Sequence, residues 1–328
     1  MTKIWGWAAD QSGCQAYRIR FPFHAMKELD PSLVLGIGST IKPEAKDNAD
    51  IIIGQRVTNQ GPSRLWQRWA QGGQKKLIYE LDDDLWNIDP ANERAYYFFG
   101  DPNTRERIIN NVKVAHVVTV STPQLAEMVH EITGHRNIHV VPNAVPPWLL
   151  DHKAEKNHHV GWGGSPTHHG DFGLLRQGMK KFLQHNPTKT FHCIGMDYAG
   201  WLKLPPASCS FTKWVPTPDD FFRTIDYSVG VAPLADTLFN RSKSDIKFLE
   251  LAALGIPTIA SDVPAYRTIQ DGLNGILVKN DHEWGRVLKA SAEDQDFFGS
   301  MGQDAKEYVA ANRTTTHTAP MWINAIMS

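Results

Sequence analysis

Cationic residues gather just before and inside a predicted helix near residue 245. Arg241, Lys243 and Lys247 lie around the point where apolar side chains take on helical spacing, and Glu250 follows Lys247 by three residues. The free amides and the dipole at the start of a helix attract phosphate, and neighbouring cations add to that attraction. This chemistry suits the binding of a phosphate or a diphosphate. A solvated helix face with two lysines beside a glutamate explains the same residues without a ligand.

A loop, a helix, a tight turn and a buried strand are predicted to position these charges. Ser244 or Asp245 can serve as the N-cap, because a short side-chain oxygen accepts hydrogen bonds from the free amides of the first turn. Gly255 suits the residue that follows the helix, and Pro257 prevents the helix from continuing. Residues 258–260 are then predicted to form a short buried strand.

A second candidate site is the run of carboxylates Asp82, Asp83 and Asp84, which follows a predicted strand at residues 77–81. Adjacent carboxylates repel one another, so they need a metal ion, a cationic partner or a raised pKa. A divalent ion held by Asp82 and Asp84 is one interpretation. A solvated acidic turn that caps the next segment is another.

Two glycine-containing loops each follow a predicted strand and precede a predicted helix. Gly13 lies in the first loop, after a strand at residues 3–8, and Gly164 and Ser165 lie in the second, after a strand at Val160. In a doubly wound sheet such loops lie at the carboxyl edge, where ligands bind. Gly13, Gly164 and Ser165 are therefore candidate binding residues, although a simple turn accounts for Gly13 equally well.

Three further residues are weaker candidates for contact with a substrate. Arg18 follows the first glycine loop, and Arg56 follows a predicted strand at residues 50–54. Trp66 lies in a predicted helix over residues 62–76 that interleaves arginines and tryptophans, a composition that suits an acceptor such as nucleic acid or a lipid headgroup. The spacing favours an ordinary amphipathic helix, with tryptophans inward and arginines outward.

The length and composition indicate a globular α/β protein of two domains. The 328 residues are 41% hydrophobic and 21% charged, and the net charge of −1 gives no global attraction to nucleic acid or membrane. Strands and helices alternate along the chain, which predicts parallel sheets. We expect one domain at residues 1–145, a proline-rich linker at 146–158 and a second domain at 159–311.

The cysteines and the apolar segments indicate where the protein resides. Cys14, Cys193 and Cys209 show neither metal-binding spacing nor an even disulfide framework, which indicates a reducing compartment. The N-terminus has no secretory apolar region, and no stretch approaches the ~18 apolar residues of a membrane span. We therefore expect a cytoplasmic protein without a transmembrane segment.

The sequence ELAALGIPTIASDVP at residues 250–264 resembles the C-terminal-domain signature of GT-B glycosyltransferases, and is similar to the retaining family 4, or glycosyl transferases group 1, type. The resemblance implies two Rossmann-like, doubly wound domains that face each other across a cleft, with a last helix at about 312–328 that packs back on the first domain. It also implies transfer of a sugar from a nucleotide-sugar donor to an acceptor hydroxyl. That transfer would proceed with retention, without a divalent metal and without a cofactor.

The resemblance and the residues together define a candidate site. In the family, the glutamate that Glu250 matches holds the ribose hydroxyls of the donor. The family's first acidic residue falls on Ser242, a departure that leaves the identity of the sugar open. Asp82 takes the place of a histidine at the end of a family strand. The expected site comprises the catalytic residues Asp82, Lys243 and Lys247; the donor-binding residues Gly13, Gly164, Ser165, Arg241, Ser242, Ser244 and Glu250; the acceptor-side residues Arg18, Arg56, Asp83 and Trp66; and no metal ligand.

Two other interpretations stay open. One is a metal-dependent GT-A-like transferase that uses Asp82 and Asp84. The other is a non-catalytic protein that binds sugar nucleotides or nucleic acid. Ser242 and the basic helix at residues 62–76 suggest this second interpretation. The acceptor is open among a glycan, a lipid, a protein and modified DNA, and the donor nucleotide and the oligomeric state are open as well.

Overall fold

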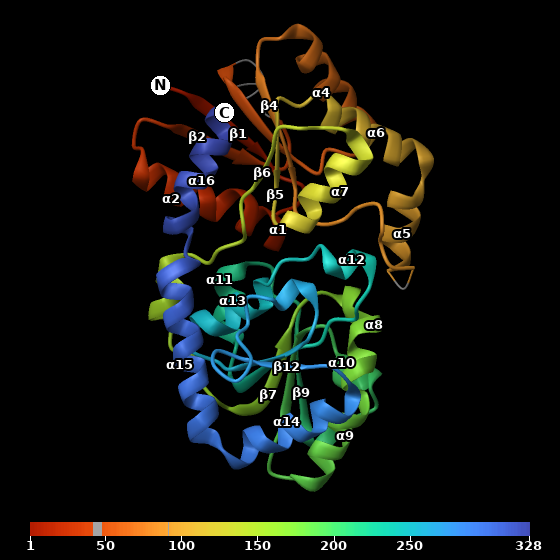
Figure 1. Ribbon diagram of the computed structural model, residues 1–328, viewed down its shortest axis with the longest axis vertical. Helices are drawn as coiled ribbons and strands as arrows, with labels where there is room; N and C mark the ends of the chain where they lie inside the picture. The colour runs from red at the N-terminus through yellow and green to blue at the C-terminus, as the bar shows by residue number, and fades with distance from the viewer. Residues whose placement is uncertain (42–47, 91) are drawn as a thin grey trace. The chain divides into compact units, whose positions relative to one another are not determined.

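The computed structural model describes residues 1–41, 48–90 and 92–328, and the chain divides into two compact units (Figure 1). The first unit comprises Met1–Ala144, Arg241–Ser244 and Thr315–Ser328, and the second comprises Val145–Asn240 and Asp245–Thr314. The short segment Arg241–Ser244 therefore groups with the first unit, although it lies within the second half of the chain. Within the described ranges, no helix is long and apolar enough to cross a membrane.

The first unit is built on a parallel sheet of six strands. The strands are β1 Lys3–Trp7, β2 Val34–Gly38, β3 Ile51–Gln55, β4 Lys76–Leu81, β5 Val117–Val120 and β6 Ile138–Val140. Their order across the sheet is β2-β1-β3-β4-β5-β6. Runs of Ile and Val are buried in β3 and β5 because helices cover both faces of the sheet. The chain reverses its direction of winding between β1 and β3, where the carboxyl ends of neighbouring strands leave room for a ligand.

Helices cover both faces of this first sheet. Trp66, Val112 and Leu125 pack from three helices onto one face, and Met26 and Trp322 pack from two helices onto the other. Figure 1 shows the last helix beside the helix that contains Met26. The helices are α1 Gly13–Gln15, α2 Phe21–Leu29, α4 Gln60–Gly72, α5 Glu93–Gly100, α6 Pro102–Lys113, α7 Pro123–Thr133 and α16 Thr315–Met327, with a π-helix at Ala16–Arg20 between α1 and α2.

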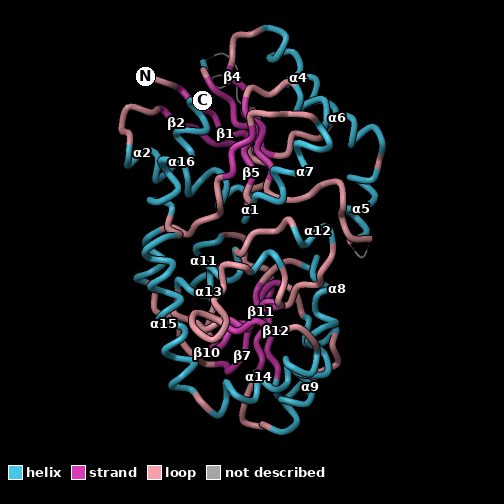
Figure 2. Tube along the Cα trace, in the orientation of Figure 1, coloured by secondary structure: helices cyan, strands magenta, loops and turns pink. Residues whose placement is uncertain are grey.

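The second unit repeats the architecture. Its strands are β7 His158–Gly163, β8 Phe191–Gly195, β9 Cys209–Lys213, β10 Tyr227–Ala232, β11 Thr258–Ser261 and β12 Ile276–Val278, in the order β12-β11-β10-β7-β8-β9. The winding reverses between β7 and β10. Figure 2 shows the strands at the centre of each unit with helices around them. The helices are α8 His169–Phe172, α9 Arg176–His185, α10 Tyr198–Trp201, α11 Pro218–Thr224, α12 Leu238–Arg241, α13 Ile246–Ala253, α14 Asp281–Glu293 and α15 Gln295–Asn312.

Local sequence signals explain several element boundaries. The Thr122 hydroxyl accepts a hydrogen bond from the Leu125 amide at 3.2 Å, so Thr122 caps α7, and Pro123 is the first residue of that helix. Gly255 takes the left-handed conformation, with φ of +67°, directly after α13 and its C-cap.

Two Rossmann-like units, each with a parallel six-stranded sheet, confirm the predicted fold class. The expected proline-rich linker is not featureless, because it contains a short 3-10 helix at Pro147–Asp151 with Leu149 fully buried. Close packing explains one glycine of the second unit. A Cβ on Gly161 would overlap the ring of Tyr227 on the neighbouring strand, so only glycine fits at that position of β7.

Candidate functional site

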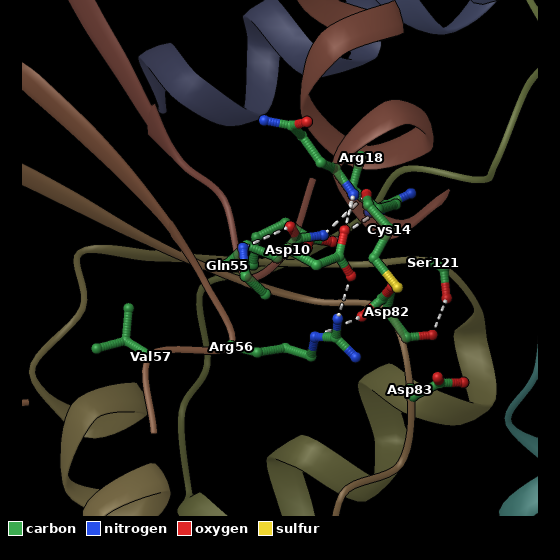
Figure 3. Close-up of polar contacts among 12 residues, drawn as sticks. Asp10, Cys14, Arg18, Gln55, Arg56, Val57, Asp82, Asp83 and Ser121 are labelled. Atoms are coloured by element: carbon green, nitrogen blue, oxygen red, sulfur yellow. Dashed lines mark hydrogen bonds and ion pairs between the residues drawn. The ribbon is translucent and has the colours of Figure 1, made fainter. Parts of the chain in front are cut away.

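Three loops bring charged side chains together at the carboxyl edge of the first sheet. Asp10 follows β1, Arg56 follows β3, and Asp82 follows β4. Figure 3 shows Arg56 between the two aspartates. An Arg56 Nη atom lies 3.1 Å from Asp10 Oδ2, and Arg56 Nε lies 3.5 Å from Asp82 Oδ1. The cluster therefore forms at the reversal point between β1 and β3, where a doubly wound sheet binds ligands.

Arg56 is held in a strained backbone conformation. Its φ is +47°, in the left-handed region that costs a non-glycine residue roughly 1–2 kcal/mol. Its amide donates to the carbonyl of Glu80 at 3.0 Å, which fixes the turn after β3. Burial acts to lower the pKa of Arg56, but the nearby Asp82 and other acidic groups raise that pKa by more. The guanidinium thus carries a permanent charge, and the strain occurs where that charge meets two carboxylates.

Residues that the sequence did not single out organise the loop after β1. Gln55 is buried, accepts a hydrogen bond from the Ala9 amide at 3.1 Å and donates one to the Cys14 carbonyl at 3.0 Å. Asp10 Oδ1 accepts from the amides of Ser12 and Gln15 at 2.9 and 3.2 Å. The signal that could have identified Asp10 is its place directly after the first strand.

Gly13 and Cys14 lie in this organised loop. A Cβ added to Gly13 would meet no atom within 4 Å, so packing does not require glycine there. Its expected part in donor binding stays a prediction. Burial raises the pKa of the Cys14 thiol well above its ordinary value, and the charge of Asp82 adds to the shift. The thiol is therefore protonated at neutral pH and is a poor nucleophile.

The three consecutive aspartates have different environments. Asp84 is buried, and its carboxylate accepts hydrogen bonds from Trp86 N at 2.9 Å and from Asn87 N and Nδ2 at 3.0 and 2.8 Å. Burial raises the pKa of Asp84, and these hydrogen bonds oppose that shift. Asp84 thus caps the turn that follows β4. In the described part of the chain, Asp82 and Asp84 do not belong to a cluster of three metal-ligating groups.

The segment Arg241–Ser244 is tied to the first unit. The Thr122 hydroxyl donates to the Ser242 carbonyl at 2.8 Å, and Asn143 Nδ2 donates to Ser244 Oγ at 2.7 Å. Lys243 Nζ lies 3.5 Å from Asp83 Oδ1. The structure therefore brings Lys243 beside Asp83, and Ser244 does not serve as a side-chain cap of α13. Thr122 and Asn143, 120 and 101 residues away from their partners, were missed because no local pattern marks such contacts.

Arg18 is a structural residue rather than an acceptor-side one, which corrects the sequence-based prediction. Its side chain is 1% exposed, its Nε lies 2.6 Å from Glu80 Oε1, and an Nη donates to the Val141 carbonyl at 2.6 Å. The guanidinium also lies 4.8 Å from the centroid of the Trp322 ring. Burial raises the pKa of Glu80 to about 7, against the opposing charge of Arg18. A side chain enclosed in this way does not reach a substrate.

Trp66 is also a core residue, so its expected acceptor contact is wrong. Its side chain is fully buried, and its Nε1 donates to the Asn111 carbonyl at 3.0 Å. Its ring packs edge-on against Tyr79, with centroids 5.9 Å apart. Arg64 and Arg68 are exposed on the outer face of α4. The amphipathic interpretation of this helix is therefore confirmed.

In the second unit, Lys247 and Glu250 form an ion pair on the first turns of α13. Lys247 Nζ lies 2.8 Å from Glu250 Oε2, with the two side chains 22% and 6% exposed, and 5.3 Å from the centroid of the Phe221 ring. Asp245 occupies the N-cap position, but its carboxylate binds two Arg313 nitrogens, both at 2.8 Å, instead of the helix amides. The amides at the start of α13 are thus left uncapped by this side chain and retain their attraction for an anion.

The second glycine loop lies at the reversal point of the second sheet. The Gly164 amide donates to the Ile194 carbonyl at 2.9 Å, and Ser165 Oγ is hydrogen-bonded to Thr167 Oγ1 at 2.8 Å. A Cβ on Gly164 would lie 2.6 Å from the Trp162 ring, so packing alone requires glycine at this position. Gly164 and Ser165 stay candidates for donor contact because of their place after β7.

Asp171 connects this loop to the one that follows β10. Its Oδ1 accepts from Ala235 N at 2.8 Å and from Asn240 Nδ2 at 2.9 Å, and its Oδ2 lies 2.7 Å from His168 Nδ1. The side chain is nearly fully buried. Asp171 therefore holds together two loops at the carboxyl edge. Sequence reasoning missed it, although its position shortly after the glycine loop was a usable signal.

Comparisons with known proteins agree with this architecture. Residues 160–293 match the family described as glycosyl transferases group 1. No curated protein sequence matches the chain. HepE of Anabaena, solved with UDP and glucose, is similar over 100% of both chains, with 12% identity and a TM-score of 0.70.

Two further solved structures share the fold. Sucrose-phosphate synthase from Thermosynechococcus elongatus is similar over 99% of this chain and 98% of its own, with 12% identity and a TM-score of 0.71. TarM of S. aureus is similar over 93% of this chain and 58% of its own, with 16% identity and a TM-score of 0.62. At these identities the likeness establishes a common fold, in which each unit is Rossmann-like.

Proposed function

We propose that this chain moves a sugar from a nucleotide-sugar donor to an acceptor hydroxyl. The match of residues 160–293 to the glycosyl transferases group 1 family supports this proposal. The observation that carries the proposal is the placement within this domain of Lys247 and Glu250, on the first turns of a helix whose N-cap side chain is engaged elsewhere. HepE has been solved with UDP-glucose, which supports a nucleotide-sugar as the class of donor.

Donor binding is assigned to the start of α13 and to the glycine loop. Glu250 accepts hydrogen bonds from the ribose hydroxyls, and Lys247 and the helix amides approach the diphosphate. Negative charge grows on the diphosphate as the glycosidic bond breaks, so preorganised amides and an ammonium group stabilise the transition state more than the ground state. Gly164 and Ser165 contribute the close backbone approach that a diphosphate needs. Arg241, Ser242, Ser244 and Gly13 stay predicted donor-binding residues.

The cluster at the carboxyl edge of the first sheet is assigned to the acceptor. Asp82 Oδ1 is buried and forms no hydrogen bond among the described residues, although Arg56 lies near it. The Asp82 side chain as a whole is 11% exposed, so its carboxylate can accept the hydrogen bond of an incoming hydroxyl group. Arg56 would then orient the carboxylate, and Lys243 beside Asp83 would add positive charge close to the reacting phosphate.

We further propose that transfer occurs with retention and without a divalent metal. Retention and metal independence both rest on the resemblance of residues 250–264 to the retaining group. The cations Lys243 and Lys247, which can neutralise a diphosphate, also support metal independence. The product's anomeric configuration, read by proton NMR, tests retention. Turnover in chelator-treated buffer without added magnesium or manganese tests metal independence, and loss of all transfer in that buffer would overturn it.

A thermal-shift panel tests the proposed function directly. The full chain is heated with UDP, GDP, ADP, CDP and TDP and with their common sugar conjugates. A ligand that binds only the folded state raises the melting temperature with its concentration. The donor nucleotide is expected to give the largest shift, and the matching nucleotide-sugar is then supplied with candidate acceptors while release of the nucleoside diphosphate is followed. If no nucleotide shifts the transition and none is released, the proposal is wrong.

A further inference from the structure

A cluster of metal-ligating side chains lies at the amino edge of the second sheet. His158 is the first residue of β7, His192 is the second residue of β8, and Asp226 directly precedes β10. Their ligating atoms all lie within 4.8 Å of one another, and the described part of the chain contains no other group of three such residues. The glycine loop follows the opposite end of β7, roughly 20 Å away at about 3.3 Å per residue. The cluster is therefore separate from the proposed transfer site.

The Asp226 carboxylate faces one nitrogen of each imidazole. Asp226 Oδ1 lies 2.6 Å from His192 Nδ1, and Asp226 Oδ2 lies 3.7 Å from His158 Nε2. Asn157 Nδ2 donates to Asp226 Oδ2 at 3.4 Å. The His158 and His192 rings lie beside each other, with centroids 4.8 Å apart. The nitrogens that face Asp226 thus converge on one small volume.

The other nitrogen of each imidazole is held by a threonine. His158 Nδ1 is 2.9 Å from Thr190 Oγ1, and His192 Nε2 is 2.9 Å from Thr212 Oγ1. When each of these nitrogens carries the proton and donates it to the hydroxyl, His158 Nε2 and His192 Nδ1 present lone pairs toward Asp226. Metal-binding histidines are oriented in this way, by a hydrogen bond from the nitrogen that does not bind the ion.

We propose that His158, His192 and Asp226 form a binding site for a divalent transition-metal ion, with zinc as the ion that fits best. Two imidazoles and a carboxylate are borderline ligands that suit zinc, cobalt and nickel, whereas magnesium and calcium prefer sites made of oxygen alone. Ligands of a tetrahedral zinc ion lie ~2.0–2.2 Å from the ion and therefore about 3.4 Å from one another. To bind the ion, His192 Nδ1 and Asp226 Oδ1 would move apart by somewhat less than an ångström. The His158 Nε2 atom, which is more distant, would move closer to them.

Solvent supplies the fourth position. The side chains of His158 and Asp226 are 21% and 20% exposed, so an ion can enter and can keep a water molecule, while His192 is 5% exposed. Ser210 Oγ, 3.2 Å from His158 Nε2, can hydrogen-bond to that water. The ion would join β7, β8 and the residue before β10 at the edge away from the proposed substrates. Its expected effect is therefore on the stability of the second unit rather than on the chemistry of transfer.

Zinc content and thermal stability of the full-length chain test the site. The protein is prepared without a polyhistidine tag, stripped with a chelator, dialysed and titrated with zinc against a chromophoric competitor. One equivalent per chain is expected to bind, and a hundredfold excess over Kd should raise the melting temperature by on the order of 5–10 °C. Cobalt should bind at the same stoichiometry and give the visible absorption of a four-coordinate ion. Magnesium and calcium should cause no shift.

Four variants separate this site from adventitious binding. Asp226→Asn keeps the size of the side chain but removes the anionic ligand, and His158→Gln removes a partly exposed imidazole ligand. Each substitution should lower zinc affinity at least about a hundredfold. Thr212→Val removes a hydrogen bond to a ligand and should lower affinity about 10–100-fold. His185→Asn, at an exposed histidine of α9, should bind zinc as the wild type does. Circular dichroism of each stripped variant shows whether it folds.

The possible results decide the proposal. Stoichiometric binding that both ligand variants abolish, while the His185 variant retains it, supports the site. Uptake of well under one equivalent by the wild type would overturn it, and the three side chains would then form only a hydrogen-bonded cluster. Equal zinc affinity in the wild type and in folded Asp226→Asn and His158→Gln would overturn it as well.

Discussion

Replacing Glu250 by glutamine tests the assignment of donor binding to α13. The Glu250 carboxylate is nearly buried and lies 2.8 Å from Lys247 Nζ, so the amide of a glutamine would fit the same space. Glutamine keeps one acceptor oxygen and loses the negative charge. If the two ribose hydroxyls donate to this carboxylate, one hydrogen bond is lost and the other becomes neutral. The change then removes specific contacts without opening a cavity.

The magnitude follows from the strength of charge-assisted hydrogen bonds. Each is worth about 1.5–3 kcal/mol, compared with about 1 kcal/mol for a neutral one, so losing one bond and neutralising the other removes roughly 2–5 kcal/mol of donor binding. At about 1.4 kcal/mol per tenfold change, the Kd for the nucleoside diphosphate rises roughly 30–4,000-fold. Loss of the partly exposed pair with Lys247 lowers the free energy of unfolding by only about 1 kcal/mol. Binding therefore changes much more than stability.

Isothermal titration calorimetry measures the effect, with the nucleoside diphosphate that gives the largest thermal shift. The matched control is Glu293→Gln, which removes the carboxylate of an exposed Lys289–Glu293 pair on α14, 3.5 Å apart, and should leave Kd unchanged. Wild-type affinity in a folded Glu250→Gln variant would refute the donor assignment. An equal loss in both variants would indicate a general charge effect instead of a ribose contact.

Four other substitutions give distinct outcomes. Asp82→Asn should lower kcat about 10²–10⁴-fold with little change in donor Kd, if its carboxylate receives the acceptor hydroxyl; unchanged turnover in a transfer assay would remove Asp82 from the mechanism. Arg18→Met should lower the free energy of unfolding by about 3–5 kcal/mol at pH 8, because it leaves the buried Glu80 carboxylate unpaired. Burial already raises the pKa of Glu80 to about 7, so this carboxylate takes up a proton as the pH falls toward 5, and the loss of stability in Arg18→Met should shrink. Denaturant titrations of the wild type and the variant at pH 8 and pH 5 measure this difference. Trp66→Phe should cost about 1–3 kcal/mol, because the Asn111 carbonyl loses its donor, while kcat/KM stays at the wild-type value; a selective loss of kcat/KM would restore the acceptor role. Burial lowers the pKa of His159 from 6.5 to about 4. Between these two pH values His159 is protonated in the unfolded chain but neutral in the folded one, so the free energy of unfolding falls as the pH drops, by up to about 3 kcal/mol. In His159→Gln that part of the pH dependence should be absent from denaturation curves, and an unaltered slope would contradict the assignment.

Local chemistry was enough to predict several elements and the α/β class of the fold. Thr122 and Pro123 start a helix because the hydroxyl satisfies a free amide and proline has no amide hydrogen to leave unpaired. Apolar runs such as residues 51–53 and 117–120 become strands buried on both faces. Strands that alternate with helices form parallel sheets, and the carboxyl ends of those strands were predicted to carry the candidate residues. These inferences depend on neighbours within a few residues, which the sequence contains.

Only the tertiary structure decided which charges are free to act. Arg18 and Arg56 look alike in the sequence, yet one is buried against Glu80, 62 positions away, and the other lies between two loop carboxylates. Likewise, His158, His192 and Asp226 come from three separate strand beginnings and show no spacing pattern. The burial and the partner of an ionisable group depend on which strands become neighbours. That order is set by long-range packing of both faces of each sheet, so no local pattern of residues specifies it.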